Sequence, residues 1–90
     1  MSDKPLLQVD ISWSPALGQK PFSGKAWAVS SENKLGKFDV LPLHANFISQ
    51  IFGALTIHLP EEAGKKELNY KFKGGVLEVS NDQVKIFLGI

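Results

Sequence analysis

The chain has 90 residues, enough for one domain of ordinary size but too few for two. Apolar residues make up 43% and charged residues 21%, as in globular proteins, and a net charge of +1 excludes the composition of a disordered chain. The absence of cysteine excludes disulfides, thiolate catalysis and cysteine zinc sites, and it favours a reducing compartment.

All ten basic residues are lysine. Bidentate recognition of phosphate and guanine is mostly performed by arginine, so the composition argues against a nucleic-acid-binding protein. The longest apolar stretch is far shorter than the ~20 residues that span a bilayer. Residues 1–10 contain neither an apolar signal core nor an arginine-rich transit pattern. We therefore expect a protein that is not inserted in a membrane and that works where it is made.

Alternation of apolar and polar residues predicts strands along most of the chain. Residues 7–13 alternate from Leu7 to Trp13. Residues 22–30 place Phe22 and small residues on one face and Trp27 on the other, which predicts a strand with apolar neighbours on both sides. Residues 55–59, 68–73 and 83–88 repeat the alternation. The predicted interior consists of Leu7, Val9, Ile11, Leu55, Ile57, Leu68, Phe72, Leu77, Val79, Val84, Ile86 and Leu88.

Turn-forming residues separate these segments. Residues 60–65 are typical of a hairpin loop, and Asn81-Asp82 is typical of a tight turn with positive φ, so both turns predict antiparallel neighbours. Residues 43–52 fit a helical face as well as a strand, and periodicity does not decide between them. The pattern predicts one all-β domain over residues 1–90, a sandwich or barrel of about seven or eight short strands.

Candidate catalytic groups are sparse. His44 and His58 have no further ligand at metal-binding spacing, and no Gly-x-Ser-x-Gly motif is present. Gly74-Gly75 is not followed by a helix that could bind phosphate, and it is typical of a bulge or a close backbone approach in a sheet. These observations favour a small binding domain without catalytic residues, metal or cofactor.

Two segments resemble motifs of the ε subunit of rotary proton-translocating ATP synthases, whose mitochondrial equivalent is called δ. Residues 36–45 resemble Gly-x-Phe-Gly-Val-Leu-Pro-Gly-His-Ala, and residues 72–79 resemble Ser-Gly-Gly-Phe-Leu-Glu-Val. The similarity extends over about residues 6–89. The positions that carry it are Gly36, Phe38, Val40, Leu41, Pro42, His44, Ala45, Gly74, Gly75, Leu77, Glu78 and Val79.

The resemblance implies the N-terminal domain of such a subunit, an antiparallel β-sandwich of about eight to ten short strands in which residues 47–51 form a strand with Phe47, Ser49 and Ile51 on one face. It implies a non-catalytic central-stalk subunit that couples proton flow to ATP synthesis, with the γ subunit and the c-ring as partners. Such a subunit is present as a monomer in a peripheral complex on the cytoplasmic face of the inner membrane, or in an organelle-encoded equivalent.

Site residues follow from the resemblance position by position. The γ-facing residues would be His44, Ala45, Phe47 and Ser49. The c-ring-facing loop would contain Glu32, Lys34, Gly36 and Lys37. That loop is acidic in many family members, but here it carries two lysines, which predicts acidic or neutral groups on the ring opposite them.

Other departures from the family concern turns and length. Asp39 and Leu43 replace motif glycines, which predicts a different backbone conformation at both positions. The chain ends at Ile90, where family members continue into a helical hairpin, so either the subunit is minimal or the sequence is a truncated piece. The alternative is an unrelated β-sandwich module that binds a protein or a ligand.

Overall fold

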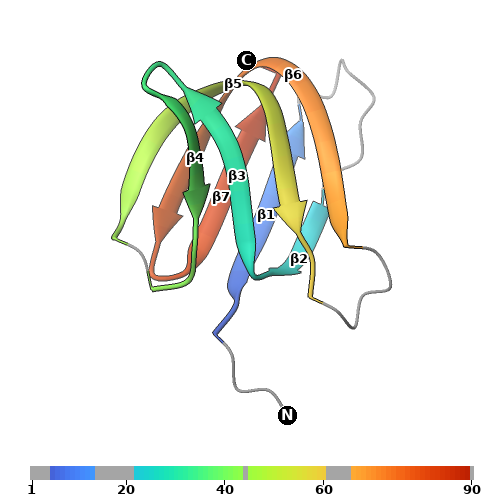
Figure 1. Cartoon of the computed structure of the whole chain (residues 1–90), viewed down its shortest axis with the longest axis vertical. Coiled ribbons are helices and arrows are strands. Elements are labelled where there is room, and N and C mark those ends of the chain that lie inside the picture. Colours follow the sequence, from blue (N-terminus) through green and yellow to red (C-terminus); the bar gives the residue numbers. More distant parts are fainter. Residues whose placement is uncertain (1–4, 14–21, 44, 61–65, 90) are drawn as a thin grey trace.

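The computed structural model describes residues 5–13, 22–43, 45–60 and 66–89 (Figure 1). All regular secondary structure in these ranges is β, which confirms the predicted fold class. The seven strands are β1 (Leu7–Trp13), β2 (Phe22–Ala26), β3 (Ala28–Asn33), β4 (Gly36–Val40), β5 (Phe47–His58), β6 (Glu67–Ser80) and β7 (Gln83–Leu88). This number is below the eight to ten that the resemblance implies, because β5 and β6 are long strands of 12 and 14 residues.

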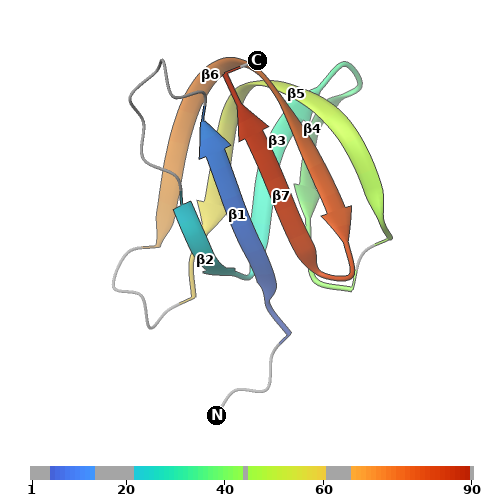
Figure 2. The ribbon, with the colours of Figure 1, turned by 180° about the vertical axis from the view of Figure 1, so that it is seen from behind.

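The strands form one sheet in the order β2-β1-β7-β6-β5-β3-β4. The second half of β6 pairs with β7, while its first half pairs with the second half of β5, which in turn pairs with β3. Figures 1 and 2 show β5 and β6 curving over the top of the molecule, with β3 and β4 on one side and β1, β2 and β7 on the other. The β-sandwich is therefore a single sheet folded into two layers.

A bulge marks the point where β5 and β6 bend. Ile51 pairs with Gly75 and Gly53 with Phe72, so two residues of β6 oppose one residue of β5. Gly53 has a φ of +87°, a conformation that glycine adopts without steric cost. A Cβ on Gly75 would lie 2.6 Å from the carbonyl oxygen of Phe87 in β7. The predicted bulge and close backbone approach at Gly74-Gly75 are both confirmed.

One strand pair departs from the predicted antiparallel arrangement. β1 and β7 are parallel, with Val9 opposite Val84 and Ile11 opposite Ile86. Turn residues predict the direction only of strands joined by a short turn, whereas β1 and β7 are the first and the last strands of the described residues. This pairing places the described ends of the chain at opposite ends of the molecule (Figure 2).

The core lies between the two layers. It contains ten of the predicted interior residues, and the other two, Leu68 and Phe72, are half-buried and pack against it. Further buried residues that the alternation did not identify are Ala26, Ala28, Val29, Val40 and Ile51.

The prediction of one continuous strand over residues 22–30 is wrong. The chain bends at Trp27, which separates β2 in one layer from β3 in the other and allows both Ala28 and Val29 to be buried. The two predicted turns differ in what the structure describes. Asn81 and Asp82 have φ values of 51° and 63° in the β6–β7 turn, as predicted, while residues 61–65 of the β5–β6 loop lie outside the described ranges. No helix in the described part of the chain is long and apolar enough to cross a membrane.

Candidate functional site

The β3–β4 hairpin carries the residues predicted to face the c-ring. Its turn consists of Lys34 and Leu35 between the paired residues Asn33 and Gly36. The backbone N–H of Leu35 donates a hydrogen bond to Asn33 Oδ1 at 2.9 Å, and Gly36 has a φ of +121°. The side chain of Leu35 is 97% exposed. The hairpin therefore presents one apolar side chain from a defined turn.

Side-chain hydrogen bonds fix this hairpin against β5. The β3–β5 backbone pairing covers only Ala28, Val29 and Ser30 of β3. Beyond it, Ser31 Oγ donates to the carbonyl oxygen of Ala54 at 2.9 Å. Nearer the tip, Asn33 Nδ2 donates to Ser49 Oγ at 3.1 Å. These two bonds replace missing ladder bonds and hold the tip in one position relative to β5.

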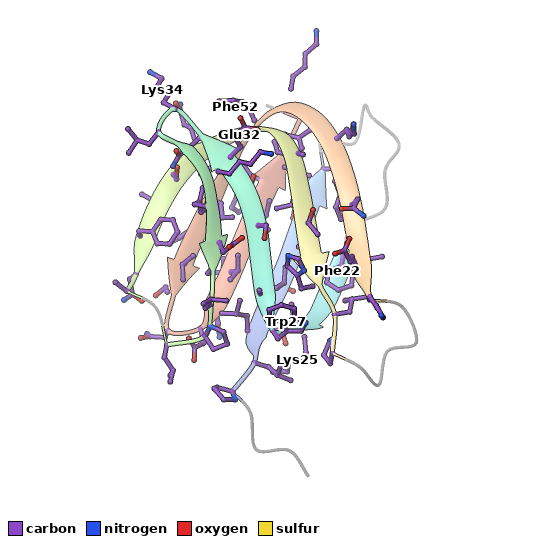
Figure 3. The ribbon with its side chains drawn as sticks, in the orientation of Figure 1. Phe22, Lys25, Trp27, Glu32, Lys34 and Phe52 are labelled. Carbon is purple, nitrogen blue, oxygen red and sulfur yellow. The ribbon has the colours of Figure 1, made fainter. Side chains whose placement is uncertain are left out.

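The exposed charges near the tip of the hairpin are positive, and exposed Asp39 lies further along β4. Lys34 and Lys37 are exposed, whereas Glu32 is half-buried. Glu32 pairs with Lys37 in the β3–β4 register, and its Oε1 lies 3.5 Å from the position that a Cβ on Gly53 would occupy. Figure 3 shows Glu32 beside Phe52 at the bend of β5 and Lys34 at the tip. The structure thus gathers the predicted c-ring-facing residues on one hairpin with a basic tip.

Among the described residues predicted to face γ, Phe47 and Ser49 lie on one face of β5 and pack toward β3 and β4. His44 lies outside the described residues, and Ala45 is exposed before the start of β5. Phe47 is half-buried and packs edge-on against Phe38 of β4, with ring centroids 6.1 Å apart. Ser49 Oγ accepts the bond from Asn33 and donates to the carbonyl oxygen of Gln50 at 2.9 Å. Phe47 and Ser49 therefore contact β3 and β4.

Sequence reasoning missed an apolar stripe on the outer face of β5, β6 and β7, formed by Ile48, Val76 and Phe87. Val76 pairs with Phe87 and also with Gln50, which shares its face of β5 with Ile48. Ile48 is 68% and Phe87 44% exposed, while Val76 is half-buried. Because these residues are distant in sequence, only the register of three strands shows that they are neighbours.

The motif segment between β4 and β5 is held by the β6–β7 turn. The N–H of Leu43 donates to Asp82 Oδ1 at 2.7 Å, and the N–H of Asn81 donates to Asn46 Oδ1 at 3.0 Å. Leu43 has a φ of +68°, the left-handed conformation that glycine favours. Leu43 thus keeps the left-handed backbone conformation that the motif glycine would adopt. Asp39, at the other replaced glycine, lies in strand β4 and has no positive φ.

A polar cluster lies on the outer face of the other layer. Ser30 Oγ donates to Asp39 Oδ1 and lies 2.9 Å from His58 Nε2. His58 packs on Trp27, with ring centroids 4.9 Å apart, and its Nδ1 lies 3.8 Å from Glu67 Oε2. A serine that donates its only proton to a carboxylate is not poised as a nucleophile. The cluster joins β3, β4, β5 and β6, and the described residues contain no group of three metal-ligating side chains.

Residues 17–88, well over half of the chain, match the family model described as ATP synthase, Delta/Epsilon chain, beta-sandwich domain. No curated protein matches.

Two solved structures share the fold at low sequence identity. A chain of the Euglena gracilis mitochondrial ATP synthase structure that contains OSCP, F1 and the c-ring superposes with a TM-score of 0.78 at 17% identity, over 98% of this chain and 53% of that chain. A chain of the Tetrahymena thermophila mitochondrial ATP synthase central stalk and c-ring gives a TM-score of 0.68 at 10% identity, over 99% of this chain and 67% of that chain. The chain thus spans about half the length of the Euglena chain.

Proposed function

The chain belongs to the family of ATP synthase delta/epsilon chains with a β-sandwich domain, and from this membership we propose that it is a non-catalytic central-stalk subunit of a rotary ATP synthase. Its role is to join the γ subunit to the c-ring and so couple proton flow to ATP synthesis. It works in a peripheral complex on the cytoplasmic face of the inner membrane, or in the organellar equivalent. The family match over residues 17–88 is the observation that carries the proposal.

The apolar stripe is the surface that we assign to γ. Exposed Phe87 pairs with Val76, and exposed Ile48 is a diagonal neighbour of Val76. The row that begins at Ile48 continues in register through the charged residues Glu78, Lys85 and Asp10. An apolar centre with a charged rim is the usual anatomy of a protein interface. We retain exposed Ala45, which precedes β5, at the end of this surface, and His44 stays a prediction from the family resemblance. Phe47 and Ser49 support it from the inner side of β5.

The β3–β4 hairpin is the surface that we assign to the c-ring. Its tip is at the top of the molecule in Figure 1, at one end of the long axis, whereas the stripe lies on a broad face of the other layer. The two partners can therefore bind the same molecule without competing for one surface.

Single cysteines test the γ contact, because the chain has none of its own. Cysteines at Ala45 and Ile48 should react with a bulky maleimide in the free protein and be protected when γ is bound. A cysteine at exposed Lys25 in β2 is the matched control and should react equally in both states. Failure of γ to copurify with the chain would contradict the proposed function. Equal labelling at Ile48 with γ bound would contradict the assignment of the stripe.

A further inference from the structure

Four exposed lysines gather where β5 and β6 bend next to the β3–β4 hairpin, and we call Lys34, Lys37, Lys71 and Lys73 the basic edge. Lys71 pairs with Ala54, whose carbonyl oxygen accepts the hydrogen bond from Ser31 of the hairpin strand. Lys73 is one of the two bulge residues opposite Phe52. These contacts therefore connect the hairpin to the part of β6 that carries Lys71 and Lys73.

The lysines of this edge outnumber the carboxylates near it. Glu32 pairs with Lys37 in the β3–β4 register and lies half-buried against Gly53. Exposed Asp39 lies two residues from Lys37 on β4 and accepts a hydrogen bond from Ser30 Oγ. Within the described ranges, the His58–Glu67 contact is the single approach of a basic and an acidic side chain within 4.0 Å, so none of the four lysines has an ion-pair partner there. The positive charge is therefore available to a partner.

Apolar side chains lie among these lysines. Leu35 projects from the hairpin turn, and Phe52 is 39% exposed at the bend of β5. Figure 3 shows Phe52 and Lys34 at the same end of the molecule. Such an edge fits a partner surface that carries carboxylates around small apolar patches.

We propose that the basic edge binds an acidic protein surface, which in the assembly proposed above is the loop face of the c-ring. The inference rests on the proposed function and reverses the acid-to-base pairing implied by the family resemblance. Lysine ammonium groups would pair with carboxylates at the rim, and Leu35 would occupy an apolar site between them. Because rim pairs act mainly on association rate and register, the contact is strongest at low salt.

The local geometry favours a protein over a lipid bilayer. Stable attachment to a membrane surface needs a large apolar face or a lipid chain in addition to basic residues. The hairpin offers one fully exposed apolar residue, and its tip is fixed by the bonds of Asn33 to Leu35 and Ser49. A fixed tip with separated charges matches carboxylates held at fixed positions.

Charge reversal tests the proposal. Binding of the full chain to the detergent-solubilised cognate c-ring is measured with and without γ, for the wild type and for Lys34→Glu with Lys37→Glu. We expect the double variant to bind about tenfold more weakly at ~10 mM salt and within about twofold of wild type at ~1 M, where the Debye length is ~3 Å. The matched control is Lys25→Glu with Lys66→Glu, which changes the net charge equally at exposed positions elsewhere and should bind as wild type does.

Three outcomes would overturn the inference: no binding of the wild type to the ring, equal binding of the hairpin variant at low salt, or an equal loss in the control variant. A fourth would be that the hairpin variant loses binding to phosphatidylglycerol vesicles but keeps binding to the ring, which would identify the partner as an anionic membrane. Binding to γ, measured on the same proteins, reports on the proposed function separately. Unchanged circular dichroism shows that each variant is folded.

Discussion

Leu43 has a backbone conformation that residues with a side chain disfavour. Its φ is +68°, its side chain is 78% exposed, and its N–H is bound to Asp82. The left-handed conformation costs a non-glycine residue about 1–2 kcal/mol, while a glycine loses about 0.4–1 kcal/mol more entropy on folding. Leu43→Gly should therefore stabilise the domain by up to about 1 kcal/mol, measured by chemical denaturation.

Leu35 provides the control for this prediction. It is also an exposed turn leucine, but its φ is not among the positive values of the described residues. Leu35→Gly should lower the free energy of unfolding slightly, because glycine raises the conformational entropy of the unfolded chain and no backbone strain is relieved. Equal changes in the two variants would show that Leu43 is not strained.

Tyr70 should make the stability of the domain fall as the pH rises into the alkaline range. Burial raises the pKa of its phenol above the usual 10.0. A raised folded-state pKa contributes stability that is fully present below the unfolded pKa and is lost as pH rises through the folded value. The wild type should therefore lose stability above about pH 10, and Tyr70→Phe should lose less of it.

Phenolate absorbance measures this effect directly, because Tyr70 is the single tyrosine of the chain. The phenol of the folded protein should titrate at higher pH than that of the protein in denaturant. An identical titration in both states, or an identical alkaline loss in Tyr70→Phe, would contradict the prediction. The comparison of the wild type with Tyr70→Phe isolates the contribution of the phenol from that of every other group.

At the scale of elements, the close contact between the backbones of β6 and β7 depends on Gly75 having no side chain. A Cβ there would lie 2.6 Å from the carbonyl oxygen of Phe87 and 2.9 Å from Leu88 Cδ2. The backbone of β7 must move to admit it, so Gly75→Ala should destabilise the domain by about 2–3 kcal/mol, at the upper end of typical overpacking. Thermal or urea unfolding measures the change.

Gly24→Ala is the matched control. A Cβ at Gly24 would meet the ring of Phe22 at 3.0 Å, and a half-buried side chain can move more easily than a strand backbone. Gly24→Ala should lower the free energy of unfolding clearly less than Gly75→Ala does. The same loss in both variants would show that the β6–β7 backbone contact is not the cause.

The elements differ in how far sequence could predict them. Asn81 and Asp82 define their turn by local chemistry, so the β6–β7 hairpin follows from the sequence. The break between β2 and β3 at Trp27 could not be predicted from the sequence. Apolar residues continue on both sides of Trp27, and the change of layer depends on tertiary packing. The parallel β1–β7 pair was also unpredictable, since no short turn joins these strands.

For the whole molecule, the stability should depend on the shared core. Leu77 is fully buried between the layers, so Leu77→Ala should cost about 2–5 kcal/mol, a large share of the total for a small domain. Leu68→Ala is the control, because half-buried Leu68 leaves a smaller cavity and should cost less. An unchanged denaturation midpoint for Leu77→Ala would contradict the assigned core.

The two candidate surfaces also differ in how well the sequence could predict them. The hairpin residues from Glu32 to Lys37 are contiguous, so a sequence motif could locate them together. The stripe joins Ile48, Val76 and Phe87 through the register of three strands, and each residue alone is an ordinary member of an alternating segment. Predicting it would have required the pairing partners of β6 on both sides.

The folding of one sheet into both layers has a mechanical consequence for the proposed rotor subunit. β5 and β6 run without interruption from the layer that carries the stripe to the layer that carries the hairpin. A twisting load applied at the stripe therefore reaches the hairpin along the covalent chain of β5 and β6 and through the hydrogen bonds between these strands. Two separate sheets could slide over each other, because apolar packing between them is not directional. Here such sliding would have to shear the β5–β6 ladder, so in the proposed role we expect the domain to transmit torque with little elastic lag.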